Sequence, residues 1–348
     1  MSWWIKDRKI KVAVLGLGRI SKYHLDAIAQ HQDLQLVGVS DSREPILEKI
    51  SQQYHVKPYL TLTEMLEHCD ADLVSICTPS GLHPMQTIEV AKAGRHVLTE
   101  KPMATHWQDG LDMVKACTQA HVRLFVVKQN RLNPTMQQLK QAIVSGRFGR
   151  IYMVAMNIFW SRPQEYYDND AWRMKGIDGG AFMNQASHYI DMAHWLIGPV
   201  ESVQGMMATL ARHIEAEDSG VLNLRWRNGA LGTVAVTMLT YPDNFEGSIT
   251  IIGHKGLVRV GGVALNEVKE WQFSEMRPED AKIKELSYQT DSVYGFGHPL
   301  YYDNVIKTFQ GKEEPLVDGQ EGLASLELLI AAYRAARDGI TVHLPLEL

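Results

Sequence analysis

The stretch IKVAVLGLGRIS at 10–21 constrains the fold of this chain more than any other. Its apolar first half predicts a buried strand, and a helix is expected over about 19–30. Between them Gly16 permits a tight turn, Gly18 lets the backbone approach a pyrophosphate, and Ser21 is small enough for close helix–strand packing. Because a helix N-terminus also carries partial positive charge, the pattern predicts a dinucleotide-binding loop, with a purely structural glycine turn as the alternative.

An acidic residue stands where such a loop needs one. Asp41 follows the predicted strand 34–40, about 23 residues after Gly18. Its carboxylate can accept hydrogen bonds from an adenosine ribose and would repel a 2′-phosphate, which favours NAD over NADP. Arg43 keeps NADP open as an alternative, because a nearby arginine can hold that phosphate.

Strands and helices alternate over the first third of the chain. Further apolar, strand-like segments lie at 73–78, 96–98 and 123–127. Capping boxes, in which side chains satisfy free helix N–H groups, are predicted at Thr61–Glu64 and Thr105–Gln108. Strands that are apolar throughout and joined by helices indicate a doubly wound parallel sheet covered on both faces.

The pattern changes after about residue 128 to segments in which apolar and polar residues alternate. They lie at 150–160, 201–210, 221–226, 231–239 and 247–253. Alternation of this kind predicts a largely antiparallel sheet with one packed face and one open face. We therefore predict an α/β chain with a Rossmann domain at 1–127 and an α+β substrate and oligomerisation domain at 128–348. The last helix, about 320–338, can pack back on the first domain.

Composition argues against several classes of protein. The 348 residues carry a net charge of −5 without a basic run, so nucleic acid is not an expected partner. No apolar run approaches the ~18 residues of a membrane span, and the N-terminal segment lacks the cleavage site of a signal peptide. Three cysteines without a C-x-x-C pair indicate reduced thiols, and we expect a cytoplasmic protein.

A lysine follows one of the predicted parallel strands, in the sequence TEKP at 99–102. Ligands bind at the carboxyl ends of strands in open parallel sheets, so Lys101 is expected beside a nicotinamide ring. Burial and a positive ring would both lower its pKa and suit it to exchange a proton at neutral pH. The alternative is a surface lysine before a turn proline.

The segment GGAFMNQASHYIDMAHWLIG at 179–198 is apolar enough for a buried helix, yet it carries several polar groups. At about 100° per residue, Asn184, His188 and Asp191 fall on one stripe. We interpret His188 as a general base or substrate ligand, with Asp191 either orienting its ring or bonding a backbone group, and a buried structural histidine as the alternative. His194 lies about 120° from His188, which argues against a metal site, and is interpreted as structural.

Five features occur together within residues 16–191: GLGRIS, Asp41, CTPSGLH, TEKPMA and DGGAFMNQASHYID. In this combination the chain resembles the Gfo/Idh/MocA family of sugar oxidoreductases. The resemblance implies a Rossmann domain followed by an open-faced sheet, homodimers or homotetramers built through that sheet, and hydride transfer between NAD(P) and a sugar hydroxyl carbon. It makes Lys101 and His188 the proton-handling pair and implies a cis Lys101–Pro102 bond. The cofactor contacts predicted are Gly16, Gly18, Arg19, Ile20, Asp41, Thr78, Pro79, His83, Glu100, Lys101 and Gln129.

One departure narrows the branch of the family. Many members have aspartate where this chain has Asn184, and an amide cannot take a proton, so the base must be His188 or Lys101. Four segments are similar to the WlbA/WbpB branch: KQNRLNP (128–134), WSRPQEYYDNDAWR (160–173), MNQASHYID (183–191) and YGFGHPLYY (294–302). That branch oxidises the 3-hydroxyl of UDP-N-acetylglucosaminuronic acid for bacterial surface polysaccharide, and some members recycle NADH with 2-oxoglutarate.

The residue chemistry of these segments agrees with a bulky anionic substrate. Arginines can fork onto carboxylate or phosphate, and aromatic rings can stack on a sugar or a uracil. The alternative for 160–173 is an aromatic loop packed at a subunit interface. The substrate contacts predicted are Arg131, Trp160, Arg162, Tyr166, Tyr167, Trp172, Arg173, Asn184 and His188.

The function predicted from the sequence is therefore an NAD-dependent dehydrogenase that acts on the CH–OH group of a nucleotide sugar and uses no metal. Two alternatives stay open. One is a dehydrogenase of the same family for inositol or a free aldose. The other is a non-catalytic, NAD-holding sugar sensor, because a fold alone does not fix a function.

Overall fold

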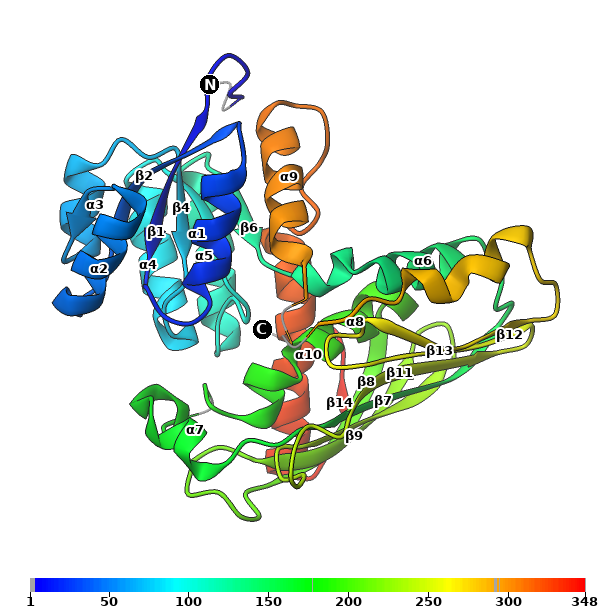
Figure 1. Ribbon diagram of the computed structural model, residues 1–348. Helices are drawn as coiled ribbons and strands as arrows, with labels where there is room; N and C mark the ends of the chain where they lie inside the picture. The colour runs from blue at the N-terminus through cyan, green and yellow to red at the C-terminus, as the bar shows by residue number, and fades with distance from the viewer. Residues whose placement is uncertain (1–3, 177, 291–292, 294, 348) are drawn as a thin grey trace. The chain divides into compact units, whose positions relative to one another are not determined.

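Two sheets organise the chain in the computed structural model, which describes residues 4–176, 178–290, 293 and 295–347 (Figure 1). Contacts group the residues into two units. The first is Met1–Lys128 with His298–Leu326, and the second is Gln129–Gly297 with Glu327–Leu348. The division predicted from the sequence, at 127/128, keeps residues 298–326 with the second domain, whereas contacts group them with the first.

Within the described residues of the first unit, six parallel strands pair in the order β3-β2-β1-β4-β5-β6. The chain moves outward from β1 to β3 and then returns to β4 on the other side, so the strand order reverses beside β1, where ligands bind in such sheets. The strands are β1 Ile10–Leu15, β2 Leu34–Ser40, β3 Pro58–Tyr59, β4 Leu73–Ile76, β5 His96–Thr99 and β6 Leu124–Val126. The predicted doubly wound parallel sheet is confirmed.

The helices that connect these strands are amphipathic, with buried apolar residues on one side. They are α1 Ser21–Gln30, α2 Glu44–Tyr54, α3 Leu62–His68, α4 His83–Lys92 and α5 Trp107–Gln119, followed later by α9 Gly297–Phe309 and α10 Gly319–Asp338. The segment between α9 and α10 docks on the edge strand β6. Val126 N–H donates to Val317 O (3.2 Å), and the Tyr301 hydroxyl donates to Val126 O (2.6 Å).

The two predicted capping boxes have different outcomes. The Thr61 hydroxyl accepts a hydrogen bond from Glu64 N–H (3.1 Å), so Thr61 caps α3 as expected, although the Glu64 carboxylate accepts from Leu60 N–H instead of completing the box. The box at Thr105 is wrong. Helix α5 begins at Trp107 with His106 at the N-cap, and the Thr105 hydroxyl lies 3.2 Å from His106 Nδ1.

In the described part of the second unit, eight strands pair in the order β13-β12-β11-β7-β10-β9-β8-β14. Neighbouring strands are antiparallel except β7 and β10, which run parallel, so the predicted largely antiparallel sheet is confirmed. The strands are β7 Ile151–Phe159, β8 Val200–Ala208, β9 Ser219–Trp226, β10 Leu231–Thr237, β11 Glu246–Gly253, β12 Gly256–Gly261, β13 Glu267–Phe273 and β14 Val342–His343.

Apolar residues of the helices and of one sheet face form the core of this unit. The helices are α6 Pro134–Val144, α7 Gln164–Asp168, α8 Ser187–Ile197 and the end of α10, with short 3₁₀ helices at Gln129–Leu132, Ala171–Arg173 and Pro278–Leu286. The strand register puts five exposed apolar side chains on the other face of the sheet, which we call the outer face: Met153, Met206, Val221, Leu231 and Ile252.

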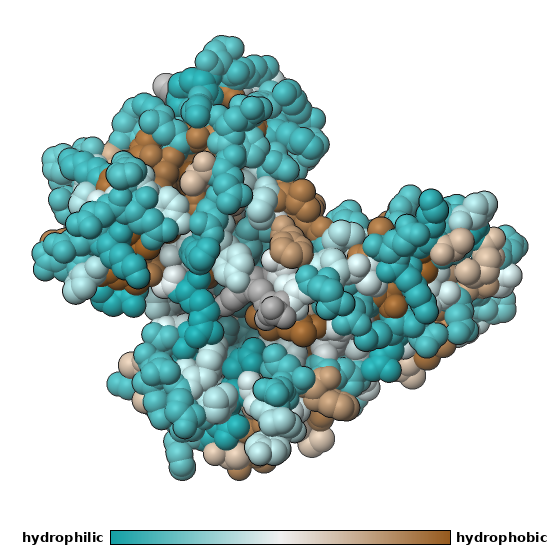
Figure 2. Space-filling view, in the orientation of Figure 1, coloured by the Kyte–Doolittle hydropathy of each residue, from teal (hydrophilic) through white to brown (hydrophobic). Residues whose placement is uncertain are grey.

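The surface view agrees with exposed apolar side chains on the eight-stranded sheet. Figure 2 shows hydrophobic side chains along its lower edge, over the strands of the eight-stranded sheet. Among the described residues, no helix is both long and apolar enough to span a membrane.

Candidate active site

The glycine loop has the geometry that its sequence predicts. Gly16 adopts φ 87°, and a Cβ atom there would lie 2.8 Å from the Thr78 backbone nitrogen, so only glycine fits. Around Gly18, a Cβ atom would meet no atom of the described residues within 4 Å. The Ser21 hydroxyl donates to Gly18 O (2.7 Å) as α1 begins. The loop therefore leaves its backbone open at the position where a pyrophosphate approaches in such folds.

Asp41 is tied to this loop and to Arg43. One carboxylate oxygen accepts a hydrogen bond from Leu17 N–H (2.7 Å), and Arg43 forks onto both oxygens through Nε (2.9 Å) and Nη2 (2.8 Å). Burial raises the pKa of Asp41, but Arg43 and the Leu17 N–H outweigh burial and lower it. The arginine that kept NADP open is thus paired with the acid that favours NAD.

The other predicted cofactor contacts are divided between the two units. His83, Arg19, Ile20 and Pro79 belong to the first unit, and Gln129 belongs to the second. His83 is buried, and its ring nitrogens lie 2.8 Å from Thr78 O and 2.9 Å from Pro102 O, so it braces two loops against each other. Arg19 is exposed, whereas Ile20 and Pro79 are half-buried. In the second unit, both polar atoms of the buried Gln129 amide lack a hydrogen-bond partner among the described residues. Within the first unit, the glycine loop and Asp41 fit a dinucleotide, and the individual contacts of all these residues with it, that of Gln129 included, stay predictions.

Lys101 follows β5 and is half-buried, and its bond to Pro102 is cis as expected. Burial lowers the pKa of Lys101 to about 8; Glu100 acts against this change and Lys128 adds to it. The predicted direction is therefore confirmed. A lysine with this pKa is partly neutral near physiological pH, so it can accept a proton or donate one.

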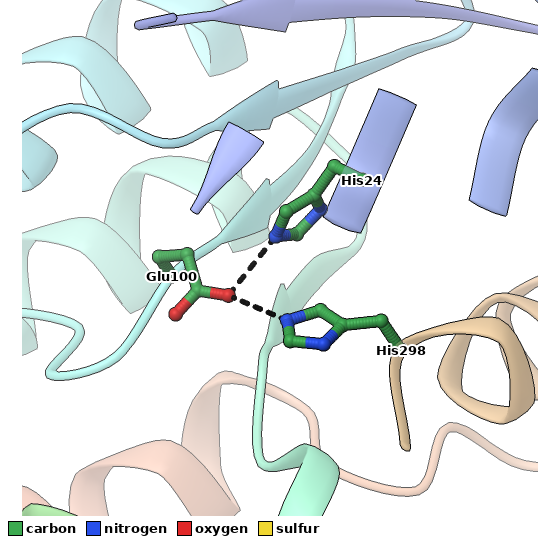
Figure 3. A group of neighbouring side chains, drawn as sticks. All are labelled: His24, Glu100 and His298. Atoms are coloured by element: carbon green, nitrogen blue, oxygen red, sulfur yellow. Dashed lines mark hydrogen bonds and ion pairs between the residues drawn. The ribbon is translucent and has the colours of Figure 1, made fainter. Parts of the chain in front are cut away.

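Sequence reasoning missed two partners of Glu100. One Glu100 oxygen lies 3.0 Å from His24 Nε2 and 3.3 Å from His298 Nε2, and all three side chains are buried (Figure 3). The other oxygen accepts a hydrogen bond from Lys101 N–H (3.1 Å). On the other side of the ring, His24 Nδ1 lies 3.0 Å from the Tyr302 hydroxyl. The predicted segment YGFGHPLYY at 294–302, which supplies His298 and Tyr302, was the only available signal, and its first residue, Tyr294, lies outside the described residues.

This cluster contains a buried ion pair. Burial raises the pKa of Glu100, but hydrogen bonds from His24 and His298 hold that pKa well below its usual range. Burial lowers the pKa of His24, yet Cys77, Tyr302 and Glu100 raise it well above its ordinary value. Burial lowers the pKa of His298. The structure thus favours a Glu100 carboxylate, a protonated His24 and a neutral His298.

The single helix predicted over 179–198 is wrong at its start. Residues Ala181–Gln185 form a π-helical turn, and α8 begins at Ser187. A π-helical turn breaks the 100° spacing, so the predicted stripe holds for His188 and Asp191 but not for Asn184. His188 is buried and Asn184 is half-buried.

Asp191 has a side-chain partner where a backbone group was one of the two alternatives. Arg131 forks onto it, with Nε donating to one oxygen (2.8 Å) and Nη2 to the other (2.7 Å), and both side chains are almost fully buried. This pair joins the 3₁₀ helix Gln129–Leu132 to α8. A substrate contact of Arg131 stays a prediction, as does an effect of Asp191 on the His188 ring.

The predicted aromatic and arginine residues at 160–173 lie together. The Arg162 guanidinium is 5.1 Å from the Trp160 ring centre and 5.5 Å from that of Tyr166. Arg173 lies 4.2 Å from the Tyr166 ring centre and 5.1 Å from that of Trp172, and it pairs with Asp170 (2.7 Å). The fully buried Tyr167 contacts Tyr166 edge to face. The cluster presents cations and ring faces in one place, and its contact with a substrate stays a prediction.

The match to known families agrees with this geometry. The NAD-binding Rossmann-fold domain of an oxidoreductase family, Gfo/Idh/MocA, matches residues 10–128, and the C-terminal alpha/beta domain of the same family matches residues 140–344. The chain belongs to the Gfo/Idh/MocA oxidoreductase family. The resemblance predicted from the motifs is confirmed, and within this family the chain is an oxidoreductase with an NAD-binding Rossmann domain.

Two solved structures and one further relative resemble the chain over nearly its whole length. The WlbA dehydrogenase from Bordetella pertussis, solved with NADH and UDP-GlcNAcA, is 61% identical with a TM-score of 0.96, covering 99% of this chain and 100% of that one. The WlbA dehydrogenase from Chromobacterium violaceum, solved with the same two ligands, is 56% identical with a TM-score of 0.94 and 99% coverage of both chains. Myo-inositol 2-dehydrogenase of Thermotoga maritima is 26% identical, covering 96% of this chain and 98% of its own.

Proposed function

We propose that this chain is an NAD-dependent dehydrogenase that oxidises the 3-hydroxyl of UDP-N-acetylglucosaminuronic acid, or a close UDP-linked aminouronic acid, in the biosynthesis of bacterial surface polysaccharide. The observation that carries the proposal is full-length similarity to two dehydrogenases solved with NADH and UDP-GlcNAcA. The paired Asp41 and Arg43 support NAD over NADP.

The chemistry of the proposed reaction divides among few residues. Bound NAD supplies the acceptor for a hydride from the sugar carbon. His188 or Lys101 takes the hydroxyl proton, and protonated Lys101 stabilises the developing alkoxide. Asn184 offers hydrogen bonds but no proton transfer. Burial gives Lys101 a pKa of about 8, which supports either role near neutral pH.

The substrate's uracil, phosphates and carboxylate are proposed to bind the cluster around Tyr166. Its arginines Arg162 and Arg173 already stack on aromatic rings, which keeps their planar guanidinium groups in defined positions. A guanidinium held in this way binds carboxylate or phosphate with two parallel hydrogen bonds.

Three further features belong to the proposal. The exposed apolar side chains of the outer face support a homodimer or homotetramer built through the eight-stranded sheet. We propose 2-oxoglutarate as the acceptor that reoxidises bound NADH, on the resemblance to the WlbA/WbpB branch. A cytoplasmic location stays a prediction from the sequence.

The test is NADH absorbance after the protein and NAD are mixed with UDP-N-acetylglucosaminuronic acid, UDP-N-acetylglucosamine, inositol or glucose, with and without 2-oxoglutarate. Reduction with the uronic acid alone supports the proposal, and turnover that continues only with 2-oxoglutarate supports the acceptor. Reduction with inositol or glucose alone contradicts the nucleotide-sugar assignment. NAD binding without reduction by any of the four compounds favours the sensor alternative.

A further inference from the structure

The π-helical turn before α8 is held by groups from distant segments. Ala181 N–H donates to the Glu217 backbone oxygen (3.0 Å), and Phe182 N–H donates to one oxygen of the Glu217 carboxylate (2.8 Å). Met183 N–H donates to the Tyr333 hydroxyl (3.1 Å), which donates in turn to the same Glu217 oxygen (2.8 Å). The first N–H groups of a helical segment have no acceptor within it. Here Glu217, two residues before β9, and the Tyr333 side chain of α10 supply those acceptors.

Close packing fixes the turn against these groups. A Cβ atom on Gly180 would lie 2.6 Å from the Tyr333 hydroxyl and 2.7 Å from both Glu217 carboxylate oxygens. A Cβ atom on Gly220, in β9, would lie 2.7 Å from the Phe182 ring. Both glycines are therefore needed for the turn to approach Glu217 and the sheet this closely. The turn therefore has no room to move toward Glu217 or toward the sheet.

The turn leads without a break into the proposed catalytic segment. Asn184 N–H donates to Gly180 O (2.9 Å), and Ala186 N–H closes the π-helical turn on Ala181 O (2.8 Å). The Ser187 hydroxyl donates to Asn184 O (2.9 Å) at the first residue of α8. A displacement of the turn would therefore move Asn184 and the start of the helix that carries His188.

This arrangement is costly if capping is its only purpose. A serine or aspartate at the N-cap would satisfy the same N–H groups from the exposed end of a helix. The chain instead buries an ionisable carboxyl, and burial raises the pKa of Glu217 to about 7. A buried carboxyl and a rare π-helical turn are both features that functional sites retain.

We propose that Glu217 and Tyr333 are positioning residues of the dehydrogenase: they hold the π-helical turn from outside and so set the positions of Asn184 and His188. The inference rests on the proposed function. Neither residue is assigned to substrate, cofactor or proton transfer. A shift of about 1 Å in a reacting group can cost roughly 10²-fold in rate, so loss of this support should act on kcat.

Three variants test the proposal under saturating NAD and UDP-N-acetylglucosaminuronic acid. Y333F removes the hydroxyl and keeps the ring, and E217A removes the carboxylate; each is expected to lower kcat by about 10- to 100-fold, with KM for NAD unchanged. E217Q keeps an acceptor oxygen for Phe182 N–H and is expected to recover most of the activity that E217A loses. Amide hydrogen exchange of 181–188 should be faster in Y333F.

The matched control is V258A. Val258 is fully buried in β12, three places from β10 in the sheet, so its truncation destabilises the same unit without touching the turn. Equal kcat in Y333F and wild type, or an equal loss in V258A, overturns the positioning role. A wild-type protein that reduces no NAD with any sugar overturns the proposed function instead. Unchanged exchange of 181–188 in Y333F then overturns the support of the turn independently.

Discussion

Glu100 of the first unit and Glu217 of the second are both almost fully buried, yet their surroundings shift their pKa values in opposite directions. Glu100 directly precedes Lys101 in the sequence, and Glu217 is proposed to support the turn that leads to His188. Burial raises the pKa of both carboxyls. At Glu100 two imidazoles outweigh burial, whereas at Glu217 the N–H of Phe182 and the hydroxyl of Tyr333 do not. The charge of a buried acid is thus decided by whether a partner can carry a positive charge.

The difference suggests a division of labour between the units. Glu100 stays ionised, and its negative charge raises the proton affinity of the neighbouring Lys101. Glu217 is near its midpoint at neutral pH and offers hydrogen-bond acceptors without a permanent charge, which acts on geometry.

The largest effect is expected at the proton-handling residues themselves. K101A should lower kcat by about 10²- to 10⁴-fold, because general acid–base catalysis contributes that much, while NADH binding followed by fluorescence stays intact. H188N should cause a similar loss if His188 is the base. Only a modest loss in H188N would make Lys101 the sole base, and unchanged turnover in K101A would remove Lys101 from the mechanism.

The second prediction concerns the ion pair of His24 and Glu100, next to Lys101. H24A leaves the buried Glu100 carboxylate without its charged partner, so the free energy of unfolding in urea should fall by about 3–5 kcal/mol. Y302F removes only a hydroxyl next to His24 and should cost about 1 kcal/mol. If the two variants are equally stable, His24 is not charged and Glu100 no longer differs from Glu217.

The third prediction uses pH to separate the two acids. The pKa of folded Glu217, about 7, lies above its ordinary value of 4.5, so the native state binds more protons between these values and loses stability as pH rises through them. The loss should reach about 3 kcal/mol, since each pKa unit is worth about 1.4 kcal/mol. E217Q cannot ionise, so its Tm relative to wild type should increase from pH 5 to pH 8. A constant difference would mean that Glu217 titrates normally.

Glu100 should behave in the opposite way. Its folded pKa is held well below 4.5, so its contribution to stability is present above pH 4.5 and is lost as pH falls toward the folded value. The difference in Tm between wild type and E100Q should therefore shrink on acidification, not on alkalinisation. The two glutamates should therefore change the Tm with pH in opposite directions, as their opposite pKa shifts require.

Features formed by residues close together in the sequence could be predicted, and contacts between distant residues could not. The glycine loop, Asp41 and Lys101 were predictable because a strand, a tight turn and a helix start are local patterns that act within about 30 residues. Glu100 and His298 are 198 residues apart, and Glu217 and Tyr333 are 116 apart, so no spacing rule joins them. These contacts follow from the tertiary fold.

Two local features were missed for other physical reasons. The π-helical turn at Ala181–Gln185 adds one residue to a helical turn, and an apolar run reads the same with or without it. At Thr105 the capping pattern is present, but His106 is the N-cap and α5 begins at Trp107, one residue later than the pattern predicts, a difference of the size usual at helix ends. Both errors concern where a helix begins, not whether one exists.

The smallest effect, and the sharpest test of the comparison, is a shift in a pH profile. If neutral Lys101 is the base, kcat/KM should rise with pH through about 8, the pKa that burial gives this lysine. The Glu100 charge raises that pKa, so E100Q should move the rise to lower pH while still accepting a hydrogen bond from His24. E217Q removes a carboxyl that is not among the groups shifting the Lys101 pKa, and should leave the rise at about 8. A profile that moves equally in both variants would mean that the two glutamates act in the same way, and one that moves in neither would assign the rise to a group other than Lys101.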